Sequence, residues 1–555
     1  MLDPKGTCAV LDALVSLPVR GPVWKPRAKR FRVCLVRPPT LTSASAYGQD
    51  AVPPLGLAYV AGALRAAGHD VHAVDAVGEA VHQYSRIPSS DRALLHGLRV
   101  AEIVARIDRR AEVIGVSCMF SVEWPVVAEL VAAIRAAFPR ALIVLGGEHV
   151  TACPELTLSA CPADAGVLGE GEETIVELLE AHGAGHDLAA VAGIVHRTAE
   201  GRVARTAPRE RIRALDEIPP PDWTCFPVET YIDNALTHGA NLGRSMPILA
   251  SRGCPYRCTF CSSPLMWTTR WSARKPEAIV AEMKDYMRRY RVTNFDFYDL
   301  TAIVKRSWIV DFCRLLIVED LGITWQLPSG TRSEAIDEEV ARLLHASGCR
   351  IVSYAPESGS PAELARIKKK VDPDRMLASM RGARRAGLTV KANFVFGFPG
   401  SSWGEALETF RFLARLAVIG VDEINAFPFS PYPGSELFDQ LLAAGKLRLD
   451  DDYFRSLLAF NDPANSVSYT ELVGSRGLSR LNYAAMGFFY ALSFVLRPHR
   501  AVQLAASRLT GDTSTRLTMA LANRRRRRIA MDLAQRTGED TVVIPAIDRP
   551  RAAAR

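Results

Sequence analysis

The sequence lacks any run of 18 or more uncharged apolar residues, so we expect no membrane-spanning helix. The nearest approach is 481–496, which lies between Arg480 and Arg497 and predicts a helix that is buried or lies at an interface. The N-terminus has no basic segment ahead of its apolar part, so we expect no signal peptide.

Regular cysteine spacing is also missing, although the chain has 11 cysteines. Most are isolated among apolar neighbours, as are Cys34, Cys118, Cys313 and Cys349, which is typical of reduced core cysteines and predicts a cytoplasmic protein.

A strong charge excess is absent too. Lys+Arg 68 minus Asp+Glu 60 gives +8, so no nucleic-acid partner is expected. Five consecutive arginines at 524–528 predict a solvated helix face or tail.

What the sequence does have is a long alternation of strand and helix patterns. With 555 residues, 48% of them hydrophobic, it has the material for several cores. After a loose leader at 1–30, apolar strand patterns occur at 31–36, 70–75, 113–118 and 141–146, with helical patterns at 55–67, 98–110 and 123–138. Fully apolar strands between helices predict a Rossmann-like α/β domain over 31–200, with a parallel sheet covered on both faces.

A Pro-rich and charged connection at 201–245 precedes a second series of six β/α units. The series predicts a partial (β/α)6 barrel over 246–435, with its site at the carboxyl ends of the strands. We expect its strands at 247–251, 293–298, 323–327, 350–354, 389–396 and 422–427, and its helices at 274–290, 306–320, 334–347, 373–386 and 403–418. The remaining segment, 436–555, is predicted to be mainly helical.

Three cysteines directly follow the first strand of the second series, with the spacing Cys-x3-Cys-x2-Cys: Cys254, Cys258 and Cys261. Soft thiolates suit zinc or an iron–sulfur cluster. A structural zinc site needs four ligands, and no fourth cysteine or histidine lies nearby in sequence. Three ligands on a four-iron cluster leave one iron open for a small chelating molecule, so the cluster is the favoured interpretation.

This motif resembles the signature of the radical S-adenosylmethionine (SAM) enzymes, including the aromatic Phe260 before the last cysteine. The resemblance extends over about 246–430. It implies that the three cysteines hold a [4Fe–4S] cluster, whose open iron binds SAM for cleavage to a 5′-deoxyadenosyl radical. It also implies SAM contacts at the ends of the barrel strands, namely Phe260, Asp299, Glu357, Gly359, Gly397 and Gly400. Asp299 departs from the family's paired acidic form.

The first domain resembles that of cobalamin-dependent radical SAM enzymes. The resemblance rests on 53–59, on the Gly146-Gly147-Glu148-His149 segment and on Gly169-Glu170-Gly171-Glu172. It implies cobalamin contacts at Pro54, Gly56, Ser117, Gly146, Gly147, His149, Gly169, Glu170 and Gly171. The common cobalt-ligating motif Asp-x-His-x-x-Gly is broken, because Asp75 stands where its glycine belongs, so His72 is interpreted as structural.

Together these resemblances imply a cobalamin-dependent radical SAM enzyme that methylates an unactivated carbon or phosphorus centre of a small molecule. A radical oxidation or cyclisation of the protoporphyrin ester cyclase type is an alternative. A tRNA methylthiotransferase and a non-catalytic iron–sulfur sensor or partner protein are further alternatives. Expected partners are the small-molecule substrate and a reducing donor such as flavodoxin or ferredoxin. Peripheral membrane contact through 481–500 is an additional hypothesis.

Overall fold

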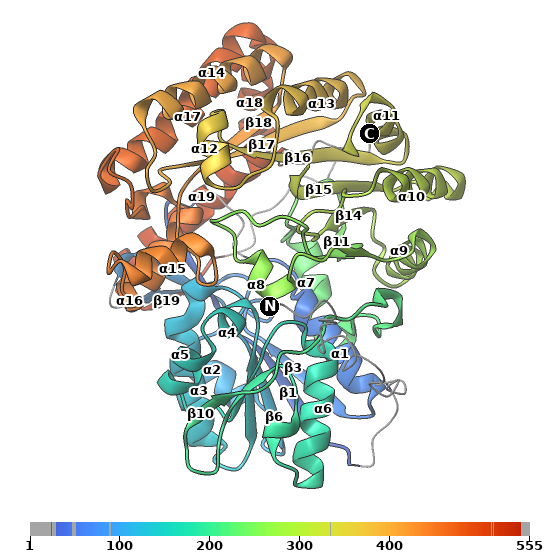
Figure 1. The fold of residues 1–555 in the computed structure, drawn as a ribbon, viewed down its shortest axis with the longest axis vertical. Coiled ribbons are helices and arrows are strands. Elements are labelled where there is room, and N and C mark those ends of the chain that lie inside the picture. Colours follow the sequence, from blue (N-terminus) through green and yellow to red (C-terminus); the bar gives the residue numbers. More distant parts are fainter. Residues whose placement is uncertain are drawn as a thin grey trace, which may run out of the picture.

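The computed structural model describes residue 24 and the ranges 29–46, 51–87, 90–332, 335–511, 513 and 515–544. Most of the leader expected at 1–30 therefore lies outside the described residues. Two α/β units lie one above the other, and the chain's last helices and strand extend from the upper unit back to the lower one (Figure 1).

The first unit, here called the front domain, is built on a seven-stranded sheet with the order β10-β9-β8-β7-β6-β1-β3. Five strands are parallel: β1 (Arg32–Arg37), β3 (Asp70–Asp75), β6 (Val113–Ser117), β7 (Leu142–Gly146) and β8 (Ala165–Val167). The antiparallel strands β9 (Ile194–Arg197) and β10 (Val203–Arg205) extend one edge. The predicted Rossmann-like parallel sheet is confirmed, and the four expected strands lie within one residue of their predicted starts.

Helices cover both faces of this sheet, because its strands are apolar on both sides. Residues of α1 (Leu55–Ala66) and α6 (Gly171–Ala184) are buried in one core, and residues of α2 (Val100–Arg106) and α3 (Trp124–Ala137) in the other. Two short helices, α4 (Glu148–Ala152) and α5 (Pro154–Ala160), follow β7.

The second unit is an open six-stranded parallel sheet, here called the barrel, with the order β11-β14-β15-β16-β17-β18. The strands are β11 (Ser245–Ile248), β14 (Asn294–Phe297), β15 (Thr324–Thr331), β16 (Cys349–Glu357), β17 (Thr389–Phe396) and β18 (Glu423–Pro428). Between them run α9 (Pro276–Tyr290), α10 (Arg306–Glu319), α11 (Glu338–Ala346), α12 (Pro361–Arg366), α13 (Pro373–Arg385) and α14 (Trp403–Ile419). The predicted (β/α)6 arrangement is confirmed.

Local sequence explains where these helices begin and end. The hydroxyl of Ser402 accepts from the backbone of Glu405 while the Glu405 carboxylate accepts from that of Ser402, which is a capping box at the start of α14. The helix ends at Gly420, whose φ of +87° gives the left-handed conformation that glycine adopts without strain.

The segment after β18 is mainly helical, as predicted. It contains α15 (Glu436–Ala443), α16 (Asp451–Ser456), α17 (Ser475–Leu496), α18 (Pro498–Thr510) and α19 (Arg516–Thr537). Helix α17 packs on α14 and on the edge strand β18. No helix among the described residues is both long and apolar enough to cross a membrane.

A third sheet, for which the sequence contains no local signal, has the order β19-β4-β5-β2 and is antiparallel. It combines β2 (Thr40–Ser43), β4 (Gln83–Ile87) and β5 (Ser90–His96) with β19 (Thr541–Val543), so the last described strand returns to the front domain. This return corrects the expectation for 524–528. Arg527 in α19 is buried and donates to the carbonyl of Ala46, so the run is only partly a solvated face.

Candidate functional site

The cysteine loop, here residues 251–263, begins at the short strand β12 (Ser251–Arg252), which pairs with β13 (Ser272–Ala273). Cys254, Cys258 and Cys261 are free and partly exposed. Burial raises the pKa of the Cys258 thiol, and it raises the pKa of the Cys261 thiol to about 12. Coordination to a metal is the interaction that deprotonates such thiols.

Two buried hydroxyls beside these cysteines fit a bound group. The side-chain oxygens of Thr259 and Ser263 have no hydrogen-bond partner among the described residues. Within the described residues, no three Cys, His, Asp or Glu side chains lie close enough to share a single metal ion. In a four-iron cluster each cysteine binds a different iron, so the cluster does not require that closeness.

Loops from the later barrel strands hold the cysteine loop. The amide of Thr259 donates to the carbonyl of Ile367 after α12 at 3.0 Å, and the amide of Leu437 in α15 donates to the carbonyl of Thr259 at 2.9 Å. The Phe260 ring lies 5.4 Å from the ring of Phe398, which follows β17. The predicted aromatic residue therefore joins the cysteine motif to the glycine-containing segment after β17.

A buried ion pair at the end of β16 joins Glu357, which the sequence predicted at the site, to Lys369, which it did not. The ammonium of Lys369 lies 2.8 Å from Oε1 of Glu357, and both side chains are about one-tenth exposed. Arg332 at the end of β15 places its guanidinium 3.5 Å from the centre of the Tyr256 ring, within the cysteine loop. The site thus has two cations close to the cysteines, and only Lys369 had a sequence signal, as one of three consecutive lysines.

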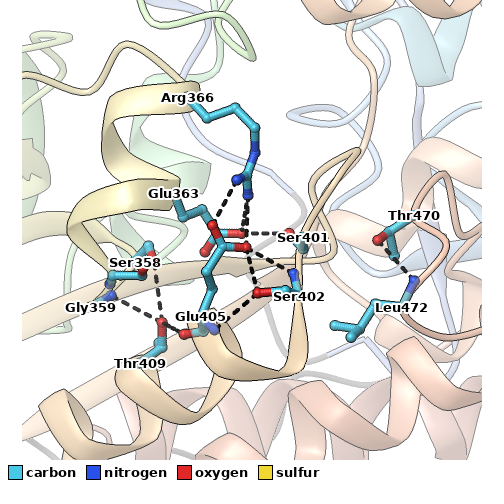
Figure 2. Close-up of polar contacts among 11 residues, drawn as sticks. Ser358, Gly359, Glu363, Arg366, Ser401, Ser402, Glu405, Thr409, Thr470 and Leu472 are labelled. Carbon is cyan, nitrogen blue, oxygen red and sulfur yellow. Dashed lines mark hydrogen bonds and ion pairs between the residues drawn. The ribbon is translucent and has the colours of Figure 1, made fainter.

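Figure 2 shows the polar network that supports the ends of β16 and β17. Thr409 of α14 accepts from the amide of Gly359 at 3.0 Å and bonds to the Ser358 hydroxyl at 3.1 Å. The Ser401 hydroxyl donates to Glu363, and Arg366 pairs with Glu405 at 2.7 Å. Because α12 and α14 each contribute to these bonds, the two loops keep a fixed relative position.

The other residues expected around SAM also lie at these strand ends. A side chain at Gly359 would come within 2.6 Å of Phe412, so this glycine permits close packing on α14. Gly397 and Gly400 have φ values of +86° and +75°. Asp299 is buried, and its two oxygens accept from the amide of Ala250 and the hydroxyl of Ser251. Its contact with SAM stays a prediction.

The residues predicted to contact cobalamin lie at the carboxyl ends of the front-domain strands or at the start of α1. Ser117 is the register partner of Gly146 across β6 and β7. Pro54 caps α1, and a side chain at Gly56 would meet no atom within 4 Å. Positions Gly146 and Gly169 have no atom closer than about 3.8 Å, and Gly171 none closer than 3.5 Å. A small side chain would therefore find room at each of these glycines.

Gly147 differs from its neighbours, because its φ is +121° and a side chain there would lie 2.4 Å from the carbonyl of Cys118. The backbone conformation and this close approach require a glycine at position 147, whether or not a cofactor is bound. Sequence reasoning also missed Met119 and Phe120 after β6, which are exposed apolar side chains at the same edge of the sheet.

His72, which was weighed as a cobalt ligand, and His149, which was predicted as a cobalamin contact, have contrasting surroundings. His149 is fully buried, stacked at 4.8 Å on Trp124 and edge-on to Phe454, and burial lowers its pKa to about 3. Its Nδ1 bonds to Ser121, whereas Nε2 has no partner among the described residues. His72 lies in β3, where its side chain is exposed and its Nε2 is 3.2 Å from Oδ1 of Asp70. The aromatic cage leaves His149 no open face.

One further relationship joins the two units. Arg252 at the start of the cysteine loop forms buried ion pairs with Glu170 and Glu172 of the front domain, and Ser262 at its end donates to Glu148. The cysteine loop therefore lies between the barrel mouth and the carboxyl ends of the front-domain strands.

Comparison with known proteins gives this arrangement a family. Residues 45–179 match the B12 binding domain model, and residues 248–413 match the radical SAM superfamily model. An uncharacterised methyltransferase of Pyrococcus horikoshii is 30% identical over 418 residues, 75% of this chain and 84% of that protein. The chain therefore belongs to the cobalamin-binding radical SAM enzymes, as the sequence predicted, and the family's cofactors are cobalamin, a [4Fe–4S] cluster and SAM.

Two further relatives have named activities. The cytidylyl-2-hydroxyethylphosphonate methyltransferase of Streptomyces wedmorensis is 27% identical over 470 residues, covering 79% of this chain and 87% of the relative. The anaerobic magnesium-protoporphyrin IX monomethyl ester cyclase of Rubrivivax gelatinosus is 28% identical over 394 residues, covering 70% and 66%. Methyl transfer and cyclisation both occur among the relatives.

Solved structures share the fold. The radical SAM methyltransferase TsrM from Kitasatospora setae, with cobalamin and a [4Fe–4S] cluster bound, matches with a TM-score of 0.58 at 18% identity, over 75% of this chain and 78% of TsrM. The cobalamin-dependent enzyme OxsB, with aqua-cobalamin and SAM bound, matches with a TM-score of 0.61 at 15% identity, over 92% of this chain and 80% of OxsB. Both matches support the two-unit α/β architecture.

Proposed function

We propose that this enzyme is a cobalamin-dependent radical SAM methyltransferase that acts on an unactivated carbon or phosphorus centre of a small molecule. The observation that carries the proposal is the place of the cysteine loop, which is bonded to barrel loops on one side and to the front-domain loops beside Gly146 and Gly169 on the other. A substrate at this junction has access to both cofactor sites.

In this proposal Cys254, Cys258 and Cys261 hold the cluster, and the strand-end residues around Glu357 and Gly397 hold SAM. When bound, the cluster supplies the electron for SAM cleavage and cobalamin supplies the methyl group. The chain's own residues bind, orient and exclude water, because a reactive carbon radical must be kept close to its target and away from other hydrogen donors. The buried pair of Glu357 and Lys369 supports these functions by fixing the loop after β16.

Mass spectrometry of products made with SAM carrying a deuterated methyl group tests the reaction. A phosphonate such as cytidylyl-2-hydroxyethylphosphonate is the first substrate to try, because a 27% identical relative methylates it. Deuterium in the product supports methyl transfer. An unlabelled, oxidised product from a magnesium-protoporphyrin ester would support the cyclase alternative instead, which the ester cyclase relative favours.

The remaining alternatives and the electron source need separate assays. A non-catalytic iron–sulfur sensor would form no 5′-deoxyadenosine from SAM under a strong reductant. A methylthiotransferase would carry a second cluster and no corrin. We propose flavodoxin or ferredoxin as the donor, which is tested by replacing the chemical reductant with each reduced protein and measuring 5′-deoxyadenosine.

We further propose that α17 and α18 contact the surface of an anionic membrane. The segment 475–510, which includes the expected contact at 481–500, contains five arginines and no Asp or Glu. Two of these arginines, Arg497 and Arg500, also donate to the carbonyls of Ala417 and Val421. Its exposed apolar side chains are Tyr483, Phe488, Val495, Leu496, Val502 and Leu509. Basic and apolar residues on the same helices are typical of a helix that lies in a membrane interface.

Flotation with vesicles tests this contact. Replacing both Val495 and Val502 by Asp is expected to abolish flotation with anionic vesicles. The control is Val318→Asp on α10, where the valine is equally exposed but lies outside these helices. Equal flotation of all variants, or none by the unmodified enzyme, would overturn the contact.

A further inference from the structure

The two acidic residues of the Gly169-Glu170-Gly171-Glu172 segment lie against the barrel. Nη1 of Arg252 is 3.0 Å from Oε1 of Glu170, and Nη2 is 2.5 Å from Oε1 of Glu172. All three side chains are about 5% exposed. A guanidinium that pairs with two carboxylates in a buried place has a defined orientation, because each of its forked donors points to a different acceptor.

Both carboxylate oxygens of Glu170 already accept hydrogen bonds from protein groups. Its Oε2 accepts from the amide of Ile212 at 2.9 Å and from Nε of Arg211 at 3.3 Å, while Oε1 takes Arg252. Arg211 in turn donates to the carbonyls of Trp267 and Arg270, just after the cysteine loop. The Glu170 carboxylate thus accepts hydrogen bonds from the connection between the two units, at Arg211 and Ile212, and from the barrel, at Arg252.

Aromatic rings and a glycine complete the arrangement. The Arg252 guanidinium lies 5.1 Å from the ring centre of Tyr59 in α1 and 5.9 Å from that of Trp267 in α8 (Ser263–Trp267). At Gly253 a side chain would meet the carbonyl of Arg270 at 2.2 Å and Arg211 at 2.8 Å. Any other residue between Arg252 and Cys254 would push these groups apart.

The other end of the cysteine loop is fastened to the front domain as well, since Ser262 donates to Glu148 at the start of α4. Both bonds come from loops that follow consecutive strands, β7 and β8, of the front sheet. From this geometry we propose that Glu170 and Glu172 are positioning residues that act on Arg252. They set the distance and orientation of the cysteine loop relative to the front domain, and Glu170 is not itself a cobalamin contact.

The consequence for catalysis rests on the proposed function. A methyl group reaches a substrate radical only if the two cofactors hold the reacting atoms within a few tenths of an ångström of a productive geometry. Loosening the Arg252 contacts should leave SAM cleavage intact but let it proceed without transfer. The clamp, here Arg252 with Glu170 and Glu172, would then determine the fraction of SAM cleavage events that yield methylated product.

The test uses the reconstituted full chain with cluster and cobalamin bound. Arg252→Lys keeps the positive charge but loses the two guanidinium nitrogens that bind separate carboxylates. Glu172→Gln and Glu170→Gln keep the shape of the side chain but lose its negative charge. Glu177→Gln is the matched control, because Glu177 forms its ion pair with Arg209, which lies in the connection after the front domain. Pulsed dipolar EPR between the reduced cluster and cob(II)alamin gives the distance distribution, and product per 5′-deoxyadenosine gives the coupling.

The proposal predicts that Arg252→Lys and Glu172→Gln keep their iron and cobalamin, broaden the cluster–cobalt distance distribution and lower product per 5′-deoxyadenosine about tenfold. Glu177→Gln should match the unmodified enzyme. An unchanged distance distribution in Arg252→Lys and Glu172→Gln would overturn the proposal. So would loss of the cluster in Arg252→Lys, or loss of cobalamin confined to Glu170→Gln. If the unmodified enzyme made no methylated product, the proposed function would fail, while the distance measurement would still decide the clamp.

Discussion

Lys369 donates to Glu357 across 2.8 Å in a buried ion pair next to the cysteine loop. Burial raises the pKa of the Cys258 thiol, Lys369 opposes that rise, and Glu357 adds to it, so the pair belongs to the electrostatic surroundings of the cysteines. Glu357 also has a φ of +65°, a left-handed backbone that is strained for a glutamate. Strain of this kind persists where a site requires it.

Removing one member of this pair should be costly. Lys369→Met leaves the Glu357 carboxylate buried and unpaired, which is expected to lower the free energy of unfolding by about 3 kcal/mol. Adding Glu357→Gln should recover part of that loss, because no unpaired charge then remains. Thermal unfolding of the single and double variants measures both effects. Lys368→Met is the control, since its partner Glu436 and Lys368 itself are about half exposed. Equal losses for Lys368→Met and Lys369→Met would contradict this account.

Gly253 should be irreplaceable. Gly253→Ala introduces a left-handed alanine and places its side chain 2.2 Å from a backbone carbonyl, so the cysteine loop must move. We expect iron content after reconstitution to fall to less than about half that of the unmodified enzyme, because strained loops fail to hold a fixed geometry. The control is Gly322→Ala, where φ is +64° but no atom lies within 4 Å. That variant should lose only about 1 kcal/mol and no iron. Full iron loading of Gly253→Ala would refute the close approach.

Asp299 should make stability depend on pH. Burial raises the pKa of its carboxyl from 3.8 to about 6 in the folded protein. Between these values the folded state binds more protons than the unfolded state, so this contribution to stability falls as pH rises and is fully lost above about pH 6. Asp299→Asn should remove a change of about 3 kcal/mol over that interval. Unfolding of both proteins at several pH values from about 4 to 7 measures the difference, and parallel profiles would contradict the assignment.

Cobalt should have no histidine ligand from this chain. His149 is enclosed by Trp124 and Phe454, and His72 lies on a strand beside Asp70. The EPR spectrum of bound cob(II)alamin is therefore expected to show no histidine nitrogen splitting, and to be the same in His149→Gln and His72→Gln. A nitrogen splitting that disappears in either variant would show that the histidine ligates cobalt.

Much of the fold follows from local sequence because its signals are local. Strand β17 has the predicted bounds, 389–396, since Val390, Phe394 and Phe396 are β-branched or aromatic residues that are buried at alternate positions. Strand β19 could not be predicted, because three residues at 541–543 carry no periodic signal and their partner β4 lies about 450 residues earlier.

The residues of the candidate site also fall into those that the sequence predicts and those that only the structure identifies. The cysteines, Phe260 and Glu357 were found through motif spacing. The positions of Arg252 and Arg332 and the ion pair of Glu170 with Arg252 depend on which loops meet across the junction, and a single sequence contains no signal for that. Arg527 shows the same limit, because its burial depends on the return of α19 to the front domain.

The most direct test of the account is EPR of the anaerobically reconstituted and reduced protein before and after SAM is added. Three cysteine ligands and one open iron predict a [4Fe–4S] signal whose g-values shift when SAM binds, and no such signal after Cys254, Cys258 and Cys261 are replaced by alanine. A signal that SAM leaves unchanged, or one that survives the triple replacement, would contradict the central claim.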